Sequence, residues 1–193
     1  MSLNVGILVF DGVDELDFVG PLDVFSYALG WGKDGRVVTV GRELNAMRGV
    51  NGLKFVPECE ISDAPTLDVV VVPGGHGATE AAKDAAILEW VDRAAQSARW
   101  VCSVCTGCFI LQAAGLTDGH EITTHSGMLD ELRSAKRGHV VAGQRYVIDG
   151  NLVSSAGVSA GIDMSLWVVG QLFGEDHAKF VRAALEYEPQ PPF

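Results

Sequence analysis

Positive charge is the scarcest property of this 193-residue sequence. Lys and Arg total 14 against 25 Asp and Glu, which leaves a formal net charge of −11 at pH 7 and a sequence pI near 4.7. Proteins that bind nucleic acid neutralise phosphate groups with clustered Lys and Arg, and this sequence has no such cluster. We therefore expect no nucleic-acid partner.

Long hydrophobic runs are missing as well. A helix that crosses a bilayer needs about 18 or more consecutive apolar residues, and no run in the sequence approaches that length. The first ten residues, MSLNVGILVF, lead directly into a strand-like segment and lack the pattern of a targeting signal. We expect a cytoplasmic protein without a membrane partner, and the 48% of apolar residues is enough for a sizeable core.

Cysteines are few, and no secretion signal accompanies them. The four are Cys59, Cys102, Cys105 and Cys108, so a disulfide framework is not expected. The last three form C-x-x-C-x-x-C, a spacing that occurs in metal sites. A fourth ligand at suitable spacing is missing, and Cys102 lies in an apolar run, so we expect neither a metal site nor a cofactor.

Short apolar runs alternate with segments of helical pattern. We predict strands over residues 5–10, 36–40, 68–72 and 99–104, and helices over residues 21–29, 81–98, 106–114, 159–173 and 176–186. Pro21 is expected in the first turn of its helix, where the missing N–H is harmless. Asn51-Gly52 and Asp149-Gly150 predict two hairpins, the first with a type I′ turn.

This alternation predicts an α/β fold. Strands that are apolar at every position are buried on both faces, which requires a doubly wound, mostly parallel sheet sandwiched by helices. No linker, repeat or composition break divides residues 1–193, so we expect a single domain. Ligands bind beyond the carboxyl ends of the strands in such sheets, where residues 11–20, 73–77 and 104–108 are expected to lie.

Cys105 is the strongest candidate for chemistry. It lies where a strand ends and a helix starts at once, with the small residues Ser103 and Gly107 two places to either side. These are the steric requirements of a nucleophile elbow. A helix N-terminus favours the thiolate, so we expect a pKa well below that of a free cysteine. The alternative is a buried structural cysteine, which is how we interpret Cys102 and Cys108.

Three further segments hold candidate site residues. Asp17 is a carboxylate set in apolar sequence, so burial would raise its pKa toward acid–base use, although a solvated loop position is the alternative. Gly74, Gly75 and His76 follow a strand and would let backbone N–H groups approach a substrate closely or stabilise an oxyanion. His125 is either a partner of the cysteine or a structural histidine.

At this point the sequence resembles the DJ-1/PfpI superfamily and, within it, the isocyanide (isonitrile) hydratases. The resemblance covers nearly the whole chain. It is carried by Leu16-Asp17 through Gly20-Pro21, Pro73-Gly-Gly75, Ser103-Val-Cys-Thr-Gly107, Ala113-Ala-Gly-Leu116, Thr123-Thr-His125, Asp149-Gly-Asn-Leu152, Ala160-Gly-Ile-Asp163, Leu185-Glu-Tyr187 and Pro191-Pro-Phe193.

The resemblance implies a sandwich fold like that of class I glutamine amidotransferases, a homodimer, and no cofactor. It implies that Cys105 is the nucleophile, that Asp17 is the general acid and base, and that Thr106 supports them. Members that hydrolyse peptides carry His where this chain has Thr106. DJ-1-like members use a glutamate on the first segment, and the nearest candidate here, Glu15, is two places away.

Two departures from the hydratase pattern concern the substrate rather than the fold. Ser126 stands where the pattern has Trp, and Cys108 replaces a serine. The function we expect is hydration of a small organic isocyanide to an N-substituted formamide through a cysteine thioimidate. The alternatives are a DJ-1-like glyoxalase or deglycase acting on α-oxoaldehydes, and a non-catalytic ligand or redox sensor related to AraC-type regulators.

The segment around Asp17 also bears on assembly and on ionisation. It is crowded with apolar side chains, which supports the homodimer; they are Val13, Leu16, Phe18, Leu22, Phe25 and Tyr27. We expect the N–H groups of Gly75 and Thr106 to lower the pKa of Cys105 and the apolar setting to raise that of Asp17. The two groups would then titrate as a coupled pair.

Overall fold

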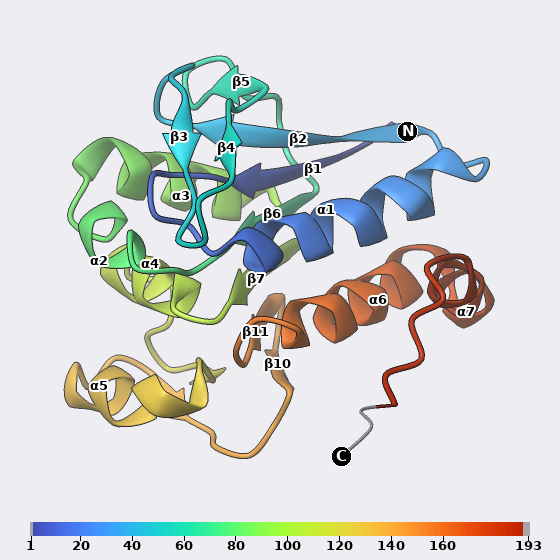
Figure 1. Ribbon diagram of the computed structural model, residues 1–193. Coiled ribbons are helices and arrows are strands. Elements are labelled where there is room, and N and C mark those ends of the chain that lie inside the picture. Colours follow the sequence, from blue (N-terminus) through green and yellow to red (C-terminus); the bar gives the residue numbers. More distant parts are fainter. Residues whose placement is uncertain (1, 191–193) are drawn as a thin grey trace.

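The computed structural model describes residues 2–190, and a seven-stranded sheet lies at its centre (Figure 1). The strand order is β10-β11-β7-β6-β1-β2-β5, and every pair is parallel except β10 with β11. The strands are β1 (Leu3–Leu8), β2 (Gly35–Gly41), β5 (Cys59–Glu60), β6 (Val69–Val72), β7 (Trp100–Val104), β10 (Tyr146–Asp149) and β11 (Leu152–Ser155). Two small two-stranded sheets pair β3 (Met47–Arg48) with β4 (Lys54–Phe55) and β8 (Glu121–Ile122) with β9 (His139–Val140).

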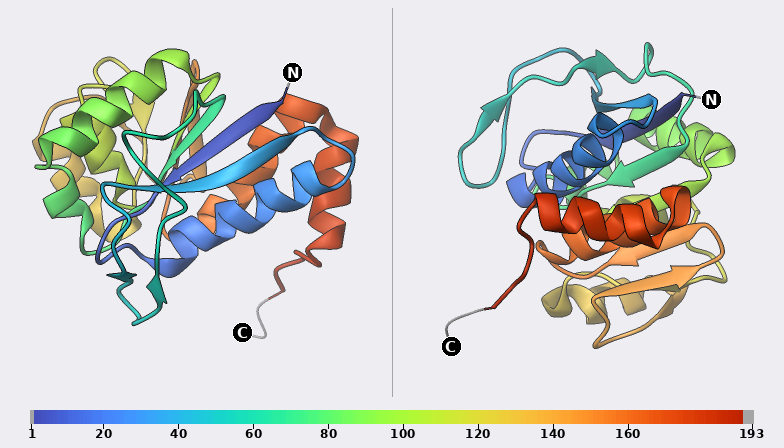
Figure 2. Two further views of the ribbon diagram at one scale, coloured as in Figure 1. Left: turned by 90° about the horizontal axis from the view of Figure 1, so that it is seen from above. Right: turned by 90° about the vertical axis from the view of Figure 1, so that its right-hand side faces the viewer.

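Helices cover both faces of the main sheet, as Figure 2 shows. One layer contains α1 (Glu15–Gly30), α6 (Ala160–Phe173) and α7 (Glu175–Ala184), which pack against one another. The other contains α2 (Ala78–Ala81), α3 (Ala85–Ser97) and α4 (Gly107–Ala113), while the short helices η1 (Ser126–Met128) and α5 (Leu129–Ser134) lie near β8 and β9. The predicted doubly wound α/β sandwich is confirmed. Within residues 2–190, no helix is both long and apolar enough to cross a bilayer.

The core explains why the strands lack alternation. All four side chains of β6 are buried, and so are residues 5–8 of β1, because helices cover each face. Val5 pairs with Val69 and Val72 pairs with Ser103, so β1, β6 and β7 run side by side in one direction. Their carboxyl ends therefore meet at one edge of the sheet.

The predicted start of the first helix is wrong. Helix α1 begins at Glu15, and the Asp14 side chain caps it by accepting a hydrogen bond from the Leu16 N–H at 3.1 Å. Pro21 consequently lies inside the helix, where it has no N–H to donate to the carbonyl of Asp17. The earlier start places Asp17 in the first turn of α1.

Another predicted helix, residues 81–98, is divided in two. Helix α2 ends at Ala81, and α3 starts only at Ala85. Asp84 causes the second start, because its carboxylate accepts hydrogen bonds from the N–H groups of Ala86 and Ile87.

Both predicted hairpins are present, but the type I′ turn is wrong. In the β3–β4 loop, Gly52 has a φ of 101°, whereas Asn51 does not have a positive φ. The loop is held from outside, since the Glu15 carboxylate accepts hydrogen bonds from the N–H groups of Asn51 and Leu53. A side chain from another element therefore sets this turn.

A substitution at Gly107 tests the close packing between α4 and β6. A methyl group at Gly107 would collide with the backbone carbonyl oxygens of Val72 and Pro73, which cannot rotate away. We expect Gly107→Ala to lower the free energy of unfolding by about 1–3 kcal/mol in urea titrations. Gly30→Ala is the control, because a methyl group at Gly30 meets no described atom within 4 Å and should leave stability equal or higher. Equal stability of the two variants would contradict the packing.

Candidate active site

Three loops meet at the carboxyl ends of β1, β6 and β7, as the sequence predicted. The Asp14 N–H donates to the carbonyl of Gly74 at 2.9 Å, which joins the first loop to the second. The Gly75 N–H donates to Oγ1 of Thr106 at 2.9 Å, which joins the second loop to the third. The strand ends therefore hold one connected site.

Cys105 occupies a sharp turn between β7 and α4. Its φ of 54° lies in the left-handed region, which non-glycine residues seldom adopt. Its N–H donates to the carbonyls of Ser155 and Ala156, and its carbonyl accepts a 2.7 Å hydrogen bond from Oγ1 of Thr124. These bonds fix the backbone in the strained conformation, and the nearly buried thiol lines a cavity.

Asp17 is fully buried beside the cysteine. Its Oδ2 accepts a 3.0 Å hydrogen bond from the N–H of Gly74, while Oδ1 has no hydrogen-bond partner within residues 2–190. Burial raises the pKa of Asp17 from 3.8 to about 7, and the charge of Asp14 adds to the rise. The Gly74 N–H and the Cys105 thiol act in the opposite direction. The predicted rise in the pKa of Asp17 is confirmed.

The predicted fall in the pKa of Cys105 is wrong. Burial raises the pKa of Cys105 to about 11, and the charge on Asp17 contributes to the rise. Hydrogen bonds from Thr106 and from the backbone of Val158 oppose this rise without overcoming it. The thiol is therefore protonated at rest, and activation must come from a neighbouring base rather than from the helix end alone.

The predicted role of Gly74 and Gly75 as free N–H donors to a substrate or an oxyanion is wrong. The N–H of Gly74 is bound to Asp17 and that of Gly75 to Thr106, so neither is free to stabilise an oxyanion or to bind the thiolate. Gly75 has a φ of 119°, and a side chain there would collide with backbone atoms of the first loop. The turn positions the catalytic candidates, while His76 lines the cavity.

Unlike Asp17, Glu15 is hydrogen-bonded to the β3–β4 hairpin and has no hydrogen bond with Cys105 among the described residues. Its carboxylate accepts hydrogen bonds from the backbone and side-chain nitrogens of Asn51 and from the N–H of Leu53, at 2.8–3.1 Å. Partial burial acts to raise the pKa of Glu15, but these hydrogen bonds lower it below the ordinary value. These hydrogen bonds join α1 to the loop of the β3–β4 hairpin.

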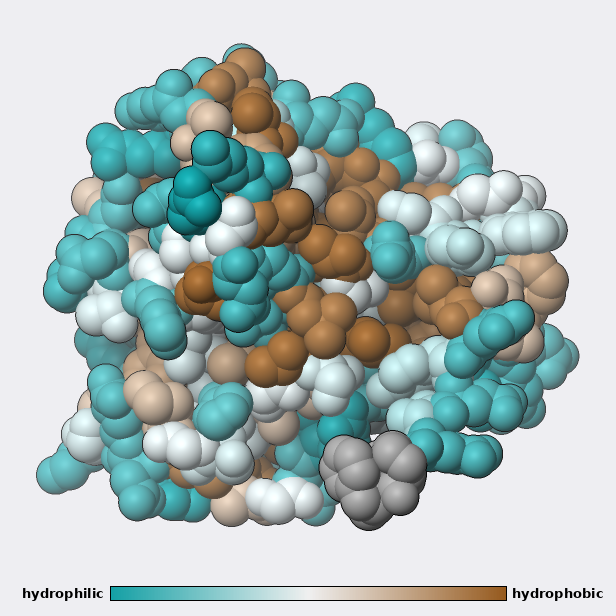
Figure 3. Space-filling model, viewed as in Figure 1, coloured by the Kyte–Doolittle hydropathy of each residue, from teal (hydrophilic) through white to brown (hydrophobic). Residues whose placement is uncertain are grey.

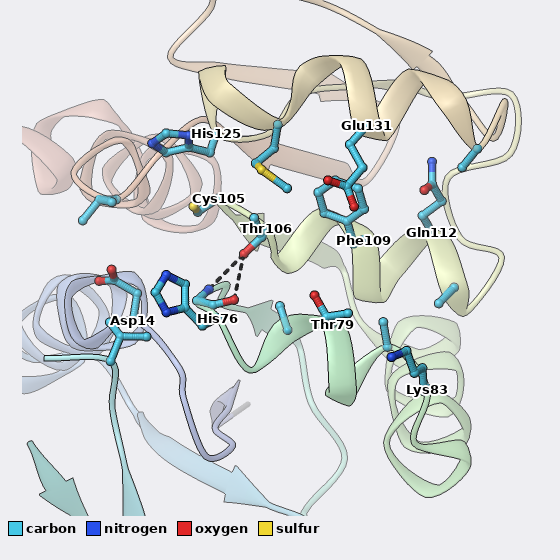
Figure 4. A pocket seen from close by; sticks show the side chains of 18 of the residues that line it. Asp14, His76, Thr79, Lys83, Cys105, Thr106, Phe109, Gln112, His125 and Glu131 are labelled. Atoms are coloured by element: carbon cyan, nitrogen blue, oxygen red, sulfur yellow. Dashed lines mark hydrogen bonds between the residues drawn. The ribbon is translucent and has the colours of Figure 1, made fainter. Parts of the chain in front are cut away.

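His125 lines the same cavity near Cys105 (Figure 4). Its Nδ1 accepts a 3.1 Å hydrogen bond from the N–H of Gly127, so the neutral ring carries its proton on Nε2. The ring also packs against Gly157, where a side chain would strike it. His125 is thus held by its own loop, as the predicted structural histidine would be, and no hydrogen bond joins it to Cys105 among the described residues.

The sequence did not indicate Val158. This β-branched residue has a φ of 46°, an outlier for its type, and its backbone contacts the Cys105 thiol from the loop before α6. No local motif marks this position, because the strain arises from the way residues 155–159 meet the β7–α4 turn. Thr124 was likewise missed as the partner of the Cys105 carbonyl.

The remaining cysteines lie outside the site. Cys102 and Cys108 are fully buried, as predicted, and burial raises the pKa of each thiol. All four cysteines are free. In the described part of the chain, no group of three or more His, Cys, Asp or Glu side chains could hold a metal ion.

The cavity has a volume of about 810 Å³ and runs from Cys105 along α4. Figure 4 shows Asp14, His76 and Cys105 at one end, Phe109 in the middle, and Lys83 at the other. Its size lies in the upper part of the range of sites that enclose drug-sized ligands. A small organic molecule can therefore reach the Cys105 thiol without a change in the fold.

Comparisons with known proteins agree with this geometry. Residues 4–171 match the model of the DJ-1/PfpI family. An isonitrile hydratase of Pseudomonas putida is 39% identical over 193 residues, which cover 100% of this chain and 82% of the relative. The crystal structure of a ThiJ/PfpI family protein from Pseudomonas syringae has a TM-score of 0.92 at 32% identity, covering 100% of this chain and 78% of that one. Drosophila melanogaster DJ-1beta, at 21% identity, TM-score 0.85 and coverage of 98% and 100%, shares the fold.

Asp17 should make stability depend on pH. Its pKa is 3.8 when unfolded and about 7 when folded, so stability falls as pH rises between these values, by roughly 2–4 kcal/mol in full. Asp17→Asn keeps an oxygen for the Gly74 N–H and removes the charge. We expect the variant to be more stable than the wild type at pH 8 and about equal to it at pH 4, in urea titrations at both values. An equal difference in the free energy of unfolding between Asp17→Asn and the wild type at both pH values would contradict the raised pKa of Asp17.

Proposed function

The chain belongs to the DJ-1/PfpI family, and we propose that it hydrates organic isocyanides to N-substituted formamides. One observation carries this proposal: the buried carboxyl group of Asp17, with its pKa raised to about 7, lies beside the thiol of Cys105, and that thiol lines a cavity of about 810 Å³. The similarity to an isonitrile hydratase at 39% identity supports it.

The first step joins Cys105 to the substrate. The terminal carbon of an isocyanide is electrophilic, and the thiol sulfur attacks it while Asp17 accepts the thiol proton. The S–C bond forms, and Asp17 delivers the same proton to that carbon. The product is a thioimidate, R–N=CH–S, and Asp17 is again a carboxylate.

The second step releases the product. Water attacks the thioimidate carbon as Asp17 accepts one of its protons, and the C–S bond then breaks to release the sulfur. One water hydrogen ends on nitrogen and the other on sulfur, so an N-substituted formamide leaves and the thiol is restored. One water molecule is consumed, and no oxidant or reductant is needed, because the carbon is at the oxidation level of formic acid in both the isocyanide and the formamide.

The ionisation of the pair suits this sequence of proton transfers. A base with a pKa near the working pH both accepts and donates protons readily, and Asp17 lies at about 7. The singly protonated pair, with one proton shared between Asp17 and Cys105, is the reactive form. The two pKa values belong to the pair, because the Asp17 charge raises the pKa of Cys105 and the Cys105 thiol lowers the pKa of Asp17.

The placement of Glu15 favours hydration over a glyoxalase or deglycase reaction. A DJ-1-like reaction on an α-oxoaldehyde would use a glutamate of this segment as its acid, and the Glu15 carboxylate is engaged with the hairpin. Assays of the purified protein with cyclohexyl isocyanide and with methylglyoxal separate the two functions. Turnover of methylglyoxal alone would overturn the proposal, and turnover of neither would indicate a sensor.

Substitution of the reactive pair tests the mechanism. Cys105→Ala should abolish formamide production, and Asp17→Asn should lower kcat/KM at least about 100-fold. Wild-type kcat/KM should rise with pH through about 7 as Asp17 loses its proton, and this limb should be missing in Asp17→Asn. Cys59→Ser is the control, because Cys59 lies on β5 away from the cavity and should keep full activity. Activity in Cys105→Ala would refute the mechanism.

The proposed assembly is a homodimer built on the face of α1. Figure 3 shows hydrophobic side chains gathered over α1, α6 and the β3–β4 hairpin. Val13, Phe18 and Phe25 point into the core, whereas Leu16 and Leu53 are 40% and 48% exposed. Pairing this face with a second copy would cover those side chains and shield the loops near Asp17 from water.

Light scattering tests this assembly. We expect a mass twice the 20.5 kDa of the chain at micromolar concentration, and a shift toward the monomer in Leu53→Lys, which places a charge on the exposed face. Ile148→Lys is the control, because Ile148 is equally apolar and exposed but lies on β10 at the other edge of the sheet. A monomeric wild type would refute the dimer.

A further inference from the structure

The cavity continues well past the reacting groups as a groove with a regular construction. Its floor is one face of α4 and the turn before it, formed by Thr106, Phe109, Gln112 and Ala113. Phe109 follows Thr106 by three positions, and Gln112 and Ala113 follow Phe109 by three and four, so the row keeps to one side of a helix for about two turns. Figure 4 shows this row leading away from Cys105.

The two walls have the same helical spacing. Ala78 and Ala82 come from α2 and its C-terminal end, and Met128 and Ala135 come from the segment containing α5. Three separate helical segments thus turn small or apolar side chains toward one space, with Thr79, Gln112 and Glu131 as polar members of the lining. Alanine leaves that space open where a larger residue would close it.

The groove has a definite length and a definite end. From Thr106 to Ala113 the helix rises about 10 Å at 1.5 Å per residue. Glu131 stands between Met128 and Ala135 on one wall, and beyond Gln112 the lining becomes charged, with Lys83 and with Arg137, whose Nη1 donates to the carbonyl of Gln112. An apolar chain therefore fits for about two helical turns from the Cys105 end and then meets charged groups.

We infer that the groove binds the substituent on the isocyanide nitrogen, and that the preferred substrates carry an extended apolar group rather than a small one. This inference rests on the proposed function, because it assigns to the groove the part of the substrate that Cys105 does not attack. Continuity supports this occupant, since Cys105 and Ala113 line one cavity of about 810 Å³. A small isocyanide would leave most of that volume filled by water.

A chain-length series measures this preference. Each methylene buried in an apolar site contributes a factor of up to about four, and the open side of the groove reduces it to about two. From ethyl to n-heptyl isocyanide, kcat/KM should rise at least tenfold. It should stop rising with longer chains, which reach the charged end.

Larger side chains in the groove should remove the preference for substrates with long apolar substituents. Ala113→Leu and Ala82→Leu each place a larger side chain in the lining of the groove, and should lower the n-heptyl to ethyl ratio of kcat/KM about tenfold. Ala85→Leu is the matched control, because Ala85 is an exposed alanine at the start of α3 that does not line the cavity. An unchanged ratio in both groove variants, or a flat series in the wild type, would overturn the inference.

A second measurement does not require isocyanide turnover. N-heptylmaleimide and N-ethylmaleimide alkylate thiols by the same reaction, and peptide mass spectrometry reports the rate at Cys105 separately from that at half-buried Cys59. We expect N-heptylmaleimide to label Cys105 at least tenfold faster, and Ala113→Leu to remove the difference. Equal rates at Cys105 would overturn the groove assignment even if isocyanides are hydrated. A clear preference without any isocyanide hydration would support the groove and refute the proposed reaction.

Discussion

The burial of one carboxyl group beside one thiol is the constraint on which this structure depends. Asp17 has no solvent-exposed surface, and a single backbone N–H, that of Gly74, binds it. A carboxylate in such a place is costly, so its pKa rises to about 7 and the group holds its proton more tightly than an exposed aspartate does. The pKa of the adjacent Cys105 is raised as well, first by burial of the thiol and then by the charge of Asp17.

The surrounding loops are arranged to hold that pair in place. Gly74 and Gly75 bring the second loop close enough for one N–H to bind Asp17 and the next to bind Thr106. Cys105 and Val158 both have positive φ angles, and hydrogen bonds to β11 and to Thr124 fix the first of them. Strain of this kind persists only where the neighbouring structure is firmly packed, and here that structure is the buried parallel sheet.

Local features of the sequence carried enough information for the sheet and for the positions of Asp17 and Cys105 near its carboxyl edge. Uniformly apolar strands predicted burial on both faces, and the small neighbours of Cys105 predicted its turn. The features that the sequence did not predict have a common cause. The engagement of Glu15 by the hairpin, the occupied N–H of Gly75 and the strain at Val158 each depend on a partner distant in the sequence. The pKa of Cys105 was misjudged because the depth of burial is a property of the assembled loops.

The central claim is that Asp17 and Cys105 titrate as one coupled pair, in which the Asp17 carboxylate adds to the effect of burial and raises the pKa of the thiol further. The direct measurement is the thiolate absorbance of Cys105 against pH in the wild type and in Asp17→Asn, each corrected with the matching Cys105→Ser protein. Removing the charge at position 17 should move the ionisation of Cys105 to lower pH, because that charge raises its pKa. An ionisation at the same or higher pH in Asp17→Asn would contradict the coupling.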